Sequence, residues 1–412
     1  MNINNRVGFD EFAVINSSTT PLRRLYEHFQ RRKLIWIIFL SICVVLITIV
    51  VTTTVLLNKT KREKTSTTEI TTSTISTSTI STSTTITITT KKITTTSSST
   101  TTTTSEQLPP SVTINSNTKW KEDAITVAGG NGRGNELNQL NAPLSIHVDS
   151  DNYSIYIADT NNHHIVKWKF GADKGEIIAG GTGPGRELYQ LNYPKDVILD
   201  KEKKYVIICD HRNLRVVQWS LQSIQNPQVL IDRIVCYGLA MDNHGDLYIS
   251  DWDRHEVRRW RQEDSEGTVI AGVNEEGNQL NQPRYIFVDD YYSVYVADTT
   301  NNRVMKWMKN VTEGTLITPG KVSEENPSSM FQPVGVIVDQ MGNIYVSNEG
   351  SHQIKRWSPG AIEGTTIVGE NEGGSGPTQL RFPQDLSFDR QGNLYVVDAS
   401  NARIQKFVIG PD

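Results

Sequence analysis

The pattern of apolar and polar positions divides the chain into successive parts. Residues 34–57 are a continuous apolar run, residues 65–105 are almost entirely Thr and Ser, and from residue 120 short apolar stretches alternate with Gly, Asn and Asp. These patterns predict a membrane-spanning helix, a segment without a packed core, and a series of β-strands. We therefore expect a tail over 1–33, a transmembrane helix over 34–57, a disordered stalk over 58–119 and a folded domain over 120–412.

The apolar run from Leu34 to Leu57 contains no charged residue, and its polar residues are mainly Thr and Ser. At about 1.5 Å per residue, a helix of this length crosses a hydrocarbon core of about 30 Å. The run is too long and begins too late for a cleaved signal peptide, and a buried core helix is rarely so long and free of charge. We expect a single-pass signal-anchor helix.

Two weak signals predict the orientation of this helix. Five basic residues precede it within about a dozen positions and four follow it, which places the N-terminal tail in the cytoplasm. The Thr/Ser tract is typical of O-glycosylated stalks outside the cell, although an unmodified linker has the same composition. We expect a type II protein of the plasma membrane with its folded domain extracellular. Asn152 and Asn310 begin N-x-Ser/Thr sequons and are the candidate glycosylation sites.

The folded domain repeats its own sequence six times. Each copy holds up to four short strand signals separated by turn residues, and the copies end 41 to 51 residues apart at one closing aromatic residue each: Trp168, Trp219, Trp260, Trp307, Trp357 and Phe407. Four antiparallel strands in a unit of this length, repeated around a ring, are the pattern of a β-propeller. The predicted fold class is all-β, a six-bladed propeller.

The two ends of the repeat region complement each other. The last copy stops after its third strand, IQKFVI, whereas an extra segment, AITVAGGNG, stands before the first copy and matches the fourth-strand segments of the others. Closing a ring in this way removes free sheet edges. We predict that residues 125–129 are the outer strand of the sixth blade.

The repeats resemble a known family. The runs YIADTNNHHIVKW, YVADTTNNRVMKW and YVVDASNARIQKF are similar to NHL repeats, in which a Tyr-Val-x-Asp strand end is followed by Asn and then His or Arg. The resemblance covers residues 120–412 and implies a propeller. It leaves the function open, because such propellers occur in ring-finger RNA regulators, in an amidating lyase and in membrane-anchored sensor domains.

Two sets of repeated polar residues invite a metal site. One repeat position holds a carboxylate or amide in every blade, and the position four residues later holds histidine in alternate blades. The sets are Asp159, Asp210, Asp251, Asp298, Asn348 and Asp398, and His163, His255 and His352. A residue present in every blade indicates structure, and turns of alternate blades lie too far apart for ligand bonds of about 2 Å. We interpret both sets as scaffold and expect no cofactor.

A binding site must instead differ from blade to blade. The first strand of each blade should line the central channel, and the residues at its start vary. The candidate ligand-binding residues at this channel mouth are Lys195, Asp196, Tyr237, Arg284, Tyr285, Gln384 and Asp385. Tyr and Arg are frequent anchors of interfaces, although an ordinary solvated rim has a similar composition.

The charge of the folded region disfavours one class of ligand, and its two cysteines leave their pairing open. Residues 106–412 carry 29 basic and 40 acidic residues, a balance of −11, which disfavours binding to nucleic acid. Cys209 and Cys236 are able to pair or to remain free, and two cysteines make no disulfide framework.

We expect a module that binds an extracellular protein, peptide or glycan rather than an enzyme. One alternative is a metal-dependent lyase or esterase with Asp196 and Asp385 as ligands. The second is an RNA-binding propeller.

Overall fold

The computed structural model describes residues 112–222, 227–272, 279–318 and 331–410. The predicted tail, the predicted transmembrane helix and most of the predicted stalk lie outside these residues. Helices within the described ranges are short 3-10 turns, and none has the length and apolarity needed to cross a bilayer.

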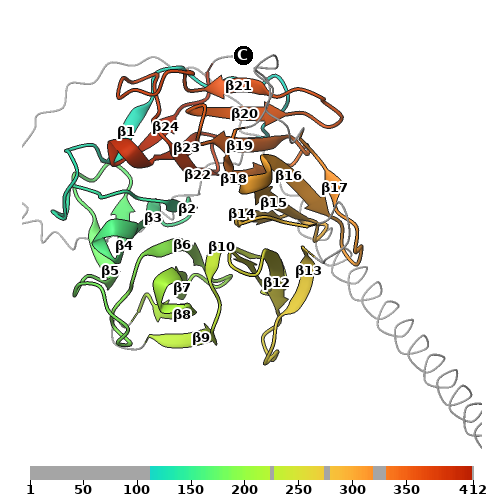
Figure 1. The fold of residues 1–412 in the computed structure, drawn as a ribbon. Helices are drawn as coiled ribbons and strands as arrows, with labels where there is room; N and C mark the ends of the chain where they lie inside the picture. The colour runs from blue at the N-terminus through green and yellow to red at the C-terminus, as the bar shows by residue number, and fades with distance from the viewer. Residues whose placement is uncertain (1–111, 223–226, 273–278, 319–330, 411–412) are drawn as a thin grey trace, which may run out of the picture. The chain divides into compact units, whose positions relative to one another are not determined.

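Six four-stranded antiparallel sheets are arranged around one axis, as Figure 1 shows. Blade 1 contains β2 (Ser145–Asp149), β3 (Ser154–Asp159), β4 (His164–Lys169) and β5 (Glu176–Gly180). Blade 2 contains β6 (Pro194–Leu199), β7 (Tyr205–Asp210), β8 (Arg215–Ser220) and β9 (Gln228–Asp232). Blade 3 contains β10 (Cys236–Met241), β11 (Leu247–Asp251), β12 (Glu256–Trp260) and β13 (Thr268–Ala271).

The remaining blades follow the same order. Blade 4 contains β14 (Pro283–Val288), β15 (Val294–Asp298), β16 (Arg303–Trp307) and β17 (Thr315–Leu316). Blade 5 contains β18 (Pro333–Val338), β19 (Ile344–Asn348), β20 (Gln353–Trp357) and β21 (Thr365–Val368). Blade 6 contains β22 (Pro383–Phe388), β23 (Leu394–Asp398), β24 (Arg403–Phe407) and, from the other end of the domain, β1 (Ile125–Gly129).

Strand β1 confirms the predicted closure. It pairs antiparallel with β24, with Ile125 opposite Lys406 and Gly129 opposite Arg403, and it is the outer strand of blade 6. Strand pairing of the first and last segments therefore joins the two ends of the domain and leaves no gap between blades 6 and 1.

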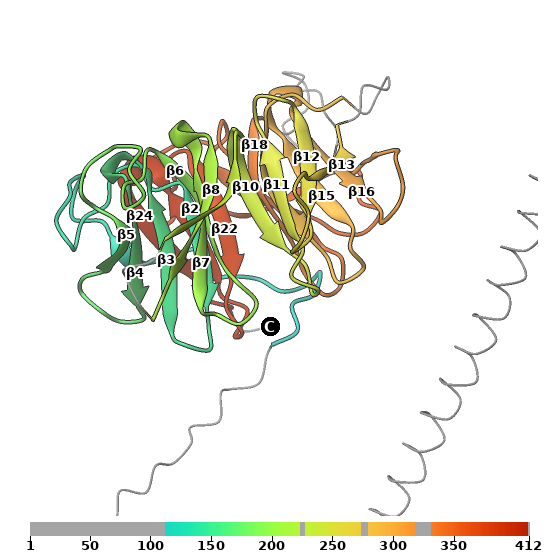
Figure 2. The ribbon, with the colours of Figure 1, turned by 90° about the horizontal axis from the view of Figure 1, so that it is seen from below.

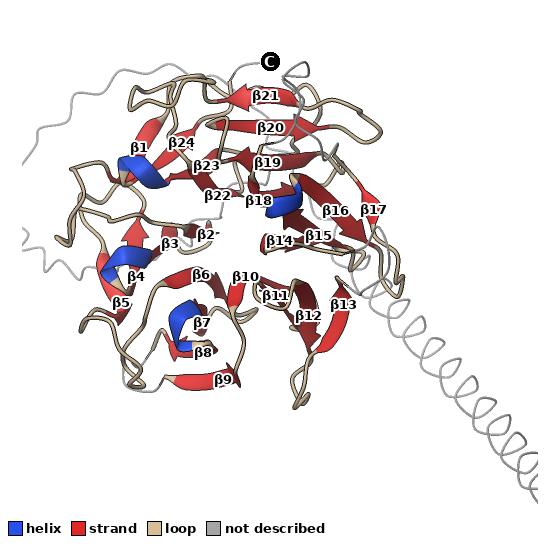
Figure 3. Ribbon diagram, viewed as in Figure 1, coloured by secondary structure: helices blue, strands red, loops and turns tan. Residues whose placement is uncertain are grey.

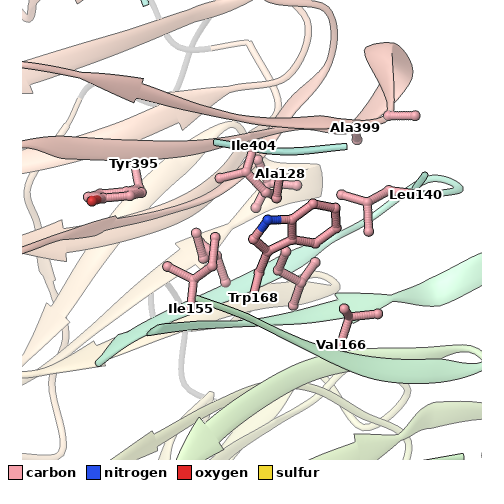
Figure 4. Close-up of a cluster of buried hydrophobic side chains, with 12 residues drawn as sticks. Ala128, Leu140, Ile155, Val166, Trp168, Tyr395, Ala399 and Ile404 are labelled. Carbon is pink, nitrogen blue, oxygen red and sulfur yellow. The ribbon is translucent and has the colours of Figure 1, made fainter. Parts of the chain in front are cut away.

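The core lies between neighbouring blades. Figure 4 shows Trp168 of blade 1 packed among Leu140, Ala128 and Ile404, so that blades 1 and 6 share one cluster. One leucine from a connector between blades lies in each of four core clusters: Leu140, Leu191, Leu280 and Leu380. Burying large apolar side chains of this kind contributes about 1.5–3 kcal/mol each.

Glycine in the outer strand region makes room for the closing tryptophan. A Cβ added to Gly267 would lie 2.5 Å from the Trp260 ring, and one added to Gly364 would lie 2.3 Å from the Trp357 ring. Atoms do not approach this closely, so glycine directly before the outer strands β13 and β21 is a packing requirement of these two blades.

Four of the blades carry a 3-10 turn between their second and third strands: η1 (Thr160–Asn162), η2 (His211–Asn213), η3 (Thr299–Asn301) and η4 (Ala399–Asn401). Figure 3 shows such turns in blue on one face of the ring. The innermost strands β2, β6, β10, β14, β18 and β22 begin on this same face, which we call the mouth face. The hairpin turns that join each innermost strand to the second strand lie on the opposite face.

The first described residues reach the propeller on the opposite face. The Val112 amide donates to the Arg390 carbonyl, and the Trp120 indole Nε1 donates to the Gly392 carbonyl at 2.9 Å; both acceptors lie in the hairpin turn of blade 6. Trp120 also stacks on Phe388 at 5.9 Å between ring centroids. The view in Figure 2 shows this segment in cyan along the lower ends of the blades.

Candidate functional site

The predicted channel mouth is built by the first residues of the innermost strands. Lys195 and Asp196 lie in β6, Tyr237 in β10, Arg284 and Tyr285 in β14, and Gln384 and Asp385 in β22. Successive side chains of a strand point to opposite sides, so adjacent residues at the mouth have different environments. Lys195 and Arg284 are half-buried, whereas the other five are buried.

Tyr237 joins the two cations of the mouth. The Lys195 Nζ lies 5.3 Å from the centre of the Tyr237 ring, and the Arg284 guanidinium lies 5.4 Å from it. Each distance is within the range of a cation–π interaction. Arg284 also forms a salt bridge with Glu349 at 2.5 Å. The structure therefore brings Lys195, Tyr237 and Arg284 together as predicted, and adds Glu349.

Tyr285 closes the mouth from below. Its hydroxyl lies 2.8 Å from the carbonyl of Leu144 and 2.9 Å from the carbonyl of Lys195, and its ring meets Tyr237 edge-to-face at 5.5 Å. Leu144 belongs to blade 1 and Lys195 to blade 2, so the side chain from blade 4 reaches across the propeller axis. Burial raises the pKa of the Tyr285 hydroxyl well above its usual value, which further favours the protonated form that donates these bonds.

Asp196 and Asp385 lie deeper than the mouth and connect neighbouring blades. Asp196 accepts hydrogen bonds from the Ser145 hydroxyl at 2.5 Å and from the backbone amide of Leu239 at 2.6 Å. Asp385 accepts a hydrogen bond from the backbone amide of Ile146 at 3.0 Å. Asp196 of β6 therefore joins β2 to β10, and Asp385 joins β22 to β2.

The environment of the two carboxylates disfavours their charged forms. Burial is the main cause that raises the pKa of Asp196, and the pKa of Asp385 is raised well above its usual value by burial and then by the nearby Asp196. Burial and mutual repulsion therefore favour the protonated forms of the two carboxyl groups. Their bonds to Ser145 and to backbone amides give them a role in holding the inner strands.

Gln384 does not join either group. Its side chain is buried, and its Nε2 lies 3.4 Å from the carbonyl of Phe382 in its own blade. Its backbone carbonyl accepts a hydrogen bond from the Ser347 hydroxyl of blade 5. The structure therefore places Gln384 at a blade junction, apart from the aromatic and cationic group.

Further residues of the mouth were not predicted. His211 lies edge-on to Tyr237 at 6.2 Å and to Trp252 at 6.3 Å, and the Arg212 guanidinium lies 4.0 Å from the Tyr193 ring centre. Burial lowers the pKa of His211, and its Nδ1 lies 2.8 Å from the Cys236 carbonyl. His211, Trp252 and Glu349 each directly follow the polar residue that ends the second strand. That repeat position also varies between blades, so the criterion used for the first strand would have found them.

The repeated Asp position is occupied by intramolecular bonds. Asp398 accepts hydrogen bonds from the Arg381 amide at 2.7 Å, the Asn401 amide group at 2.9 Å and Arg403 Nε at 2.7 Å. Asp159, Asp210 and Asp298 accept the same kind of backbone bond from the preceding connector. These contacts confirm the scaffold interpretation for those blades.

The alternate histidines also hold blades together. Each adopts a positive φ and accepts, through Nδ1, the backbone amide of a residue in the following blade. The pairs are His163 with Tyr193, His255 with Gln282, and His352 with Phe382, at 3.0 to 3.2 Å. Among the residues that the structure describes, no group of three or more His, Cys, Asp or Glu side chains is placed to hold a metal ion.

Cys209 and Cys236 form a disulfide with a Cα–Cα distance of 5.7 Å. Cys209 lies in β7 of blade 2 and Cys236 begins β10 of blade 3, directly beside Tyr237. Both cysteines are fully buried. The disulfide therefore fixes one side of the mouth by a covalent bond between blades.

The fold matches many solved structures. A structural genomics protein of unknown function from Bacteroides thetaiotaomicron has a TM-score of 0.57 at 16% identity, covering 70% of this chain and 76% of that one. An auxiliary nutrient binding protein from the same organism has a TM-score of 0.54 at 15% identity, covering 73% and 75%. A gluconolactonase from Xanthomonas campestris has a TM-score of 0.53 at 12% identity, covering 74% and 96%. At such identities the likeness shows the fold alone.

Comparison by sequence finds far fewer matches than comparison by structure. No curated protein matches the chain. A family profile described as NHL repeat matches residues 380–407, which span β22, β23, η4 and β24 of blade 6. The matched blade has the same strand order as the five others. The NHL-repeat match in blade 6 and the six-bladed ring of the described residues fit the predicted NHL-repeat β-propeller.

Proposed function

We propose that the propeller is a binding module held outside the cell by the N-terminal helix, with the channel mouth as its ligand surface. The observation that carries the proposal is the direction of attachment. The segment from Val112 to Trp120 joins the propeller on the face opposite the mouth. A tether attached there leaves the mouth free to meet a partner.

Two features support the extracellular location. The disulfide between Cys209 and Cys236 is of a kind that persists in oxidising compartments and is rare in the cytosol. The Thr/Ser tract before the domain is typical of an extracellular stalk. The spanning helix itself, Leu34 to Leu57, remains a prediction from hydropathy and length.

The contacts of the mouth favour binding over catalysis. Tyr285 is bonded across the axis beneath the mouth, and Asp196 and Asp385 are engaged by Ser145 and by backbone amides. The aromatic and arginine side chains at the rim are of the types enriched at interaction hot spots. One solved protein of the same fold is described as an auxiliary nutrient binding protein, and this description is compatible with a binding role for the fold.

Protease treatment of intact cells tests the location. The full chain carries an epitope tag at each end, and trypsin is added before and after the membrane is permeabilised. We expect the C-terminal tag to leave intact cells while the N-terminal tag stays protected. Protection of the C-terminal tag until permeabilisation would place the propeller inside.

Selection from a displayed peptide library tests the mouth. The library is panned on cells that carry the full chain, and binders are re-tested on Tyr237→Ala. As a matched control, Gln340→Ala changes an exposed residue on the opposite face. We expect selected peptides to lose binding to Tyr237→Ala only. Binders that are insensitive to Tyr237→Ala and Arg284→Ala would exclude the mouth as the ligand surface.

A further inference from the structure

The mouth contains an ammonium group that forms no salt bridge with any described carboxylate. Among the described residues, the Lys195 Nζ has a cation–π contact with Tyr237 but neither a hydrogen bond nor a salt bridge. Its side chain is half-buried. A partly desolvated charge without a hydrogen-bonded partner is costly, and this cost is removed when an anion binds.

The neighbouring charges do not neutralise Lys195. The carboxylate of Glu349 is already bonded to Arg284, and Arg212 adds a second positive charge near Lys195. Burial, followed by repulsion from Arg284 and Arg212, lowers the pKa of Lys195 to about 8, and the smaller opposing effect of the Glu349 carboxylate does not reverse this shift. This cationic mouth, Lys195, Arg212 and Arg284, is unusual because residues 106–412 carry 40 acidic and 29 basic residues.

The shape of the mouth restricts what binds there. Tyr285 is bonded to the carbonyls of Leu144 and Lys195 beneath the cations. A ligand therefore lies on the surface above Tyr285, with Tyr237 and the half-buried Trp252 beside it. Small molecules prefer deep concave sites, whereas Tyr, Trp and Arg side chains are typical anchors for protein partners.

Resting on the proposed function, we propose that the ligand is an acidic peptide segment whose carboxylate pairs with Lys195, with Arg284 and Arg212 flanking it. Electrostatic complementarity at such a site determines which partners bind. The negative charge of the rest of the propeller repels long polyanions, and the local charge of the mouth selects a short acidic segment.

The test measures binding of two fluorescent peptides to the purified full chain in detergent micelles. The probes are a hexaglutamate peptide and a hexaglutamine peptide of equal length. We expect the first to bind at least tenfold more tightly, with affinity that falls as salt is raised. Lys195→Gln should remove most of this preference and Lys195→Arg should keep it, while Lys169→Gln, an exposed lysine of β4, should change nothing.

The pH profile separates binding by Lys195 from a structural role. Affinity for hexaglutamate should decline between about pH 7 and pH 9 in the wild type, because the Lys195 pKa is lowered to about 8. It should stay level in Lys195→Arg, since arginine remains charged throughout this range. Circular dichroism confirms that each variant is folded.

Several outcomes would overturn the inference. Equal binding of the two peptides would do so, as would unchanged preference in a folded Lys195→Gln variant, or tighter binding of a uronate oligosaccharide or a short RNA. If library peptides that bind through Tyr237 prove neutral, this inference fails while the proposed function stands. If no selected peptide depends on the mouth, the proposed function fails as well.

Discussion

The disulfide between blades 2 and 3 makes a quantitative prediction about stability. The two cysteines are 27 residues apart, and closing a loop of this length lowers the entropy of the unfolded chain. The chain-entropy relation gives about 3.5 kcal/mol of stabilisation at 25 °C for such a loop. For a domain of this size, a loss of that amount lowers the melting temperature by roughly 7 °C.

The perturbation is the double variant Cys209→Ala/Cys236→Ala, and the assay is thermal unfolding followed by tryptophan fluorescence with and without dithiothreitol. We expect the reductant to lower the melting temperature of the wild type and to leave the double variant unchanged. Comparison of the wild type with and without reductant isolates the covalent bond from the small cavity that the alanines leave. Cys43→Ala, which changes the third cysteine, is the matched control.

The same samples include a chemical check. Denatured, unreduced wild-type chain should present one thiol to a thiol reagent, and Cys43→Ala should present none. Three reactive thiols in the unreduced wild type, together with a melting temperature that does not respond to reductant, would refute the disulfide.

Further predictions concern charge, closure and modification. The raised pKa of Asp385 favours its protonated form in the folded state, so its contribution to stability is full at low pH and declines as pH rises through the folded pKa. Asp385→Asn should therefore gain stability relative to the wild type as pH increases, measured by denaturant titration. A difference in stability that stays constant with pH would contradict this. Trp120→Ala should cost about 3–5 kcal/mol in the same titrations, because a buried indole and its bond to blade 6 are lost; a loss below 1 kcal/mol would show that the segment is not anchored. If the propeller is extracellular, Asn310 should carry more glycan than Asn152: both are exposed, but the side-chain amide of Asn152 already donates to Asp149. Glycopeptide mass spectrometry measures both, and the reverse order would contradict the structure.

The sequence predicted the propeller well because each blade repeats the same local requirements. Strand β1 was identifiable because a surplus segment at one end matched a missing strand at the other. The scaffold role of Asp398 and His352 followed from their repetition, and their bonds to connector amides agree with it.

The parts that sequence could not predict depend on contacts between blades. Cys209 and Cys236 occupy different repeat positions, so only the packing of blade 3 against blade 2 reveals that they meet. The hydrogen bond from Tyr285 to the Leu144 carbonyl crosses the propeller axis. It depends on the diameter of the propeller and on the side-chain rotamer of Tyr285. Asp196 belonged to the predicted mouth by position, but the alternation of side chains along β6 places it inside.

The pairing of β1 with β24 determines when the propeller can close during synthesis. Strand β1 leaves the ribosome before every other strand of the propeller, yet its partner β24 is the last strand to emerge. Pairing between segments so far apart in sequence is slow to form, because a large loop must close first. Synthesis therefore has to reach β24 before the ring can close, and until then β1 has no partner strand in blade 6. A truncation that removes only β24 would leave β1 without its partner, whichever blades had already folded.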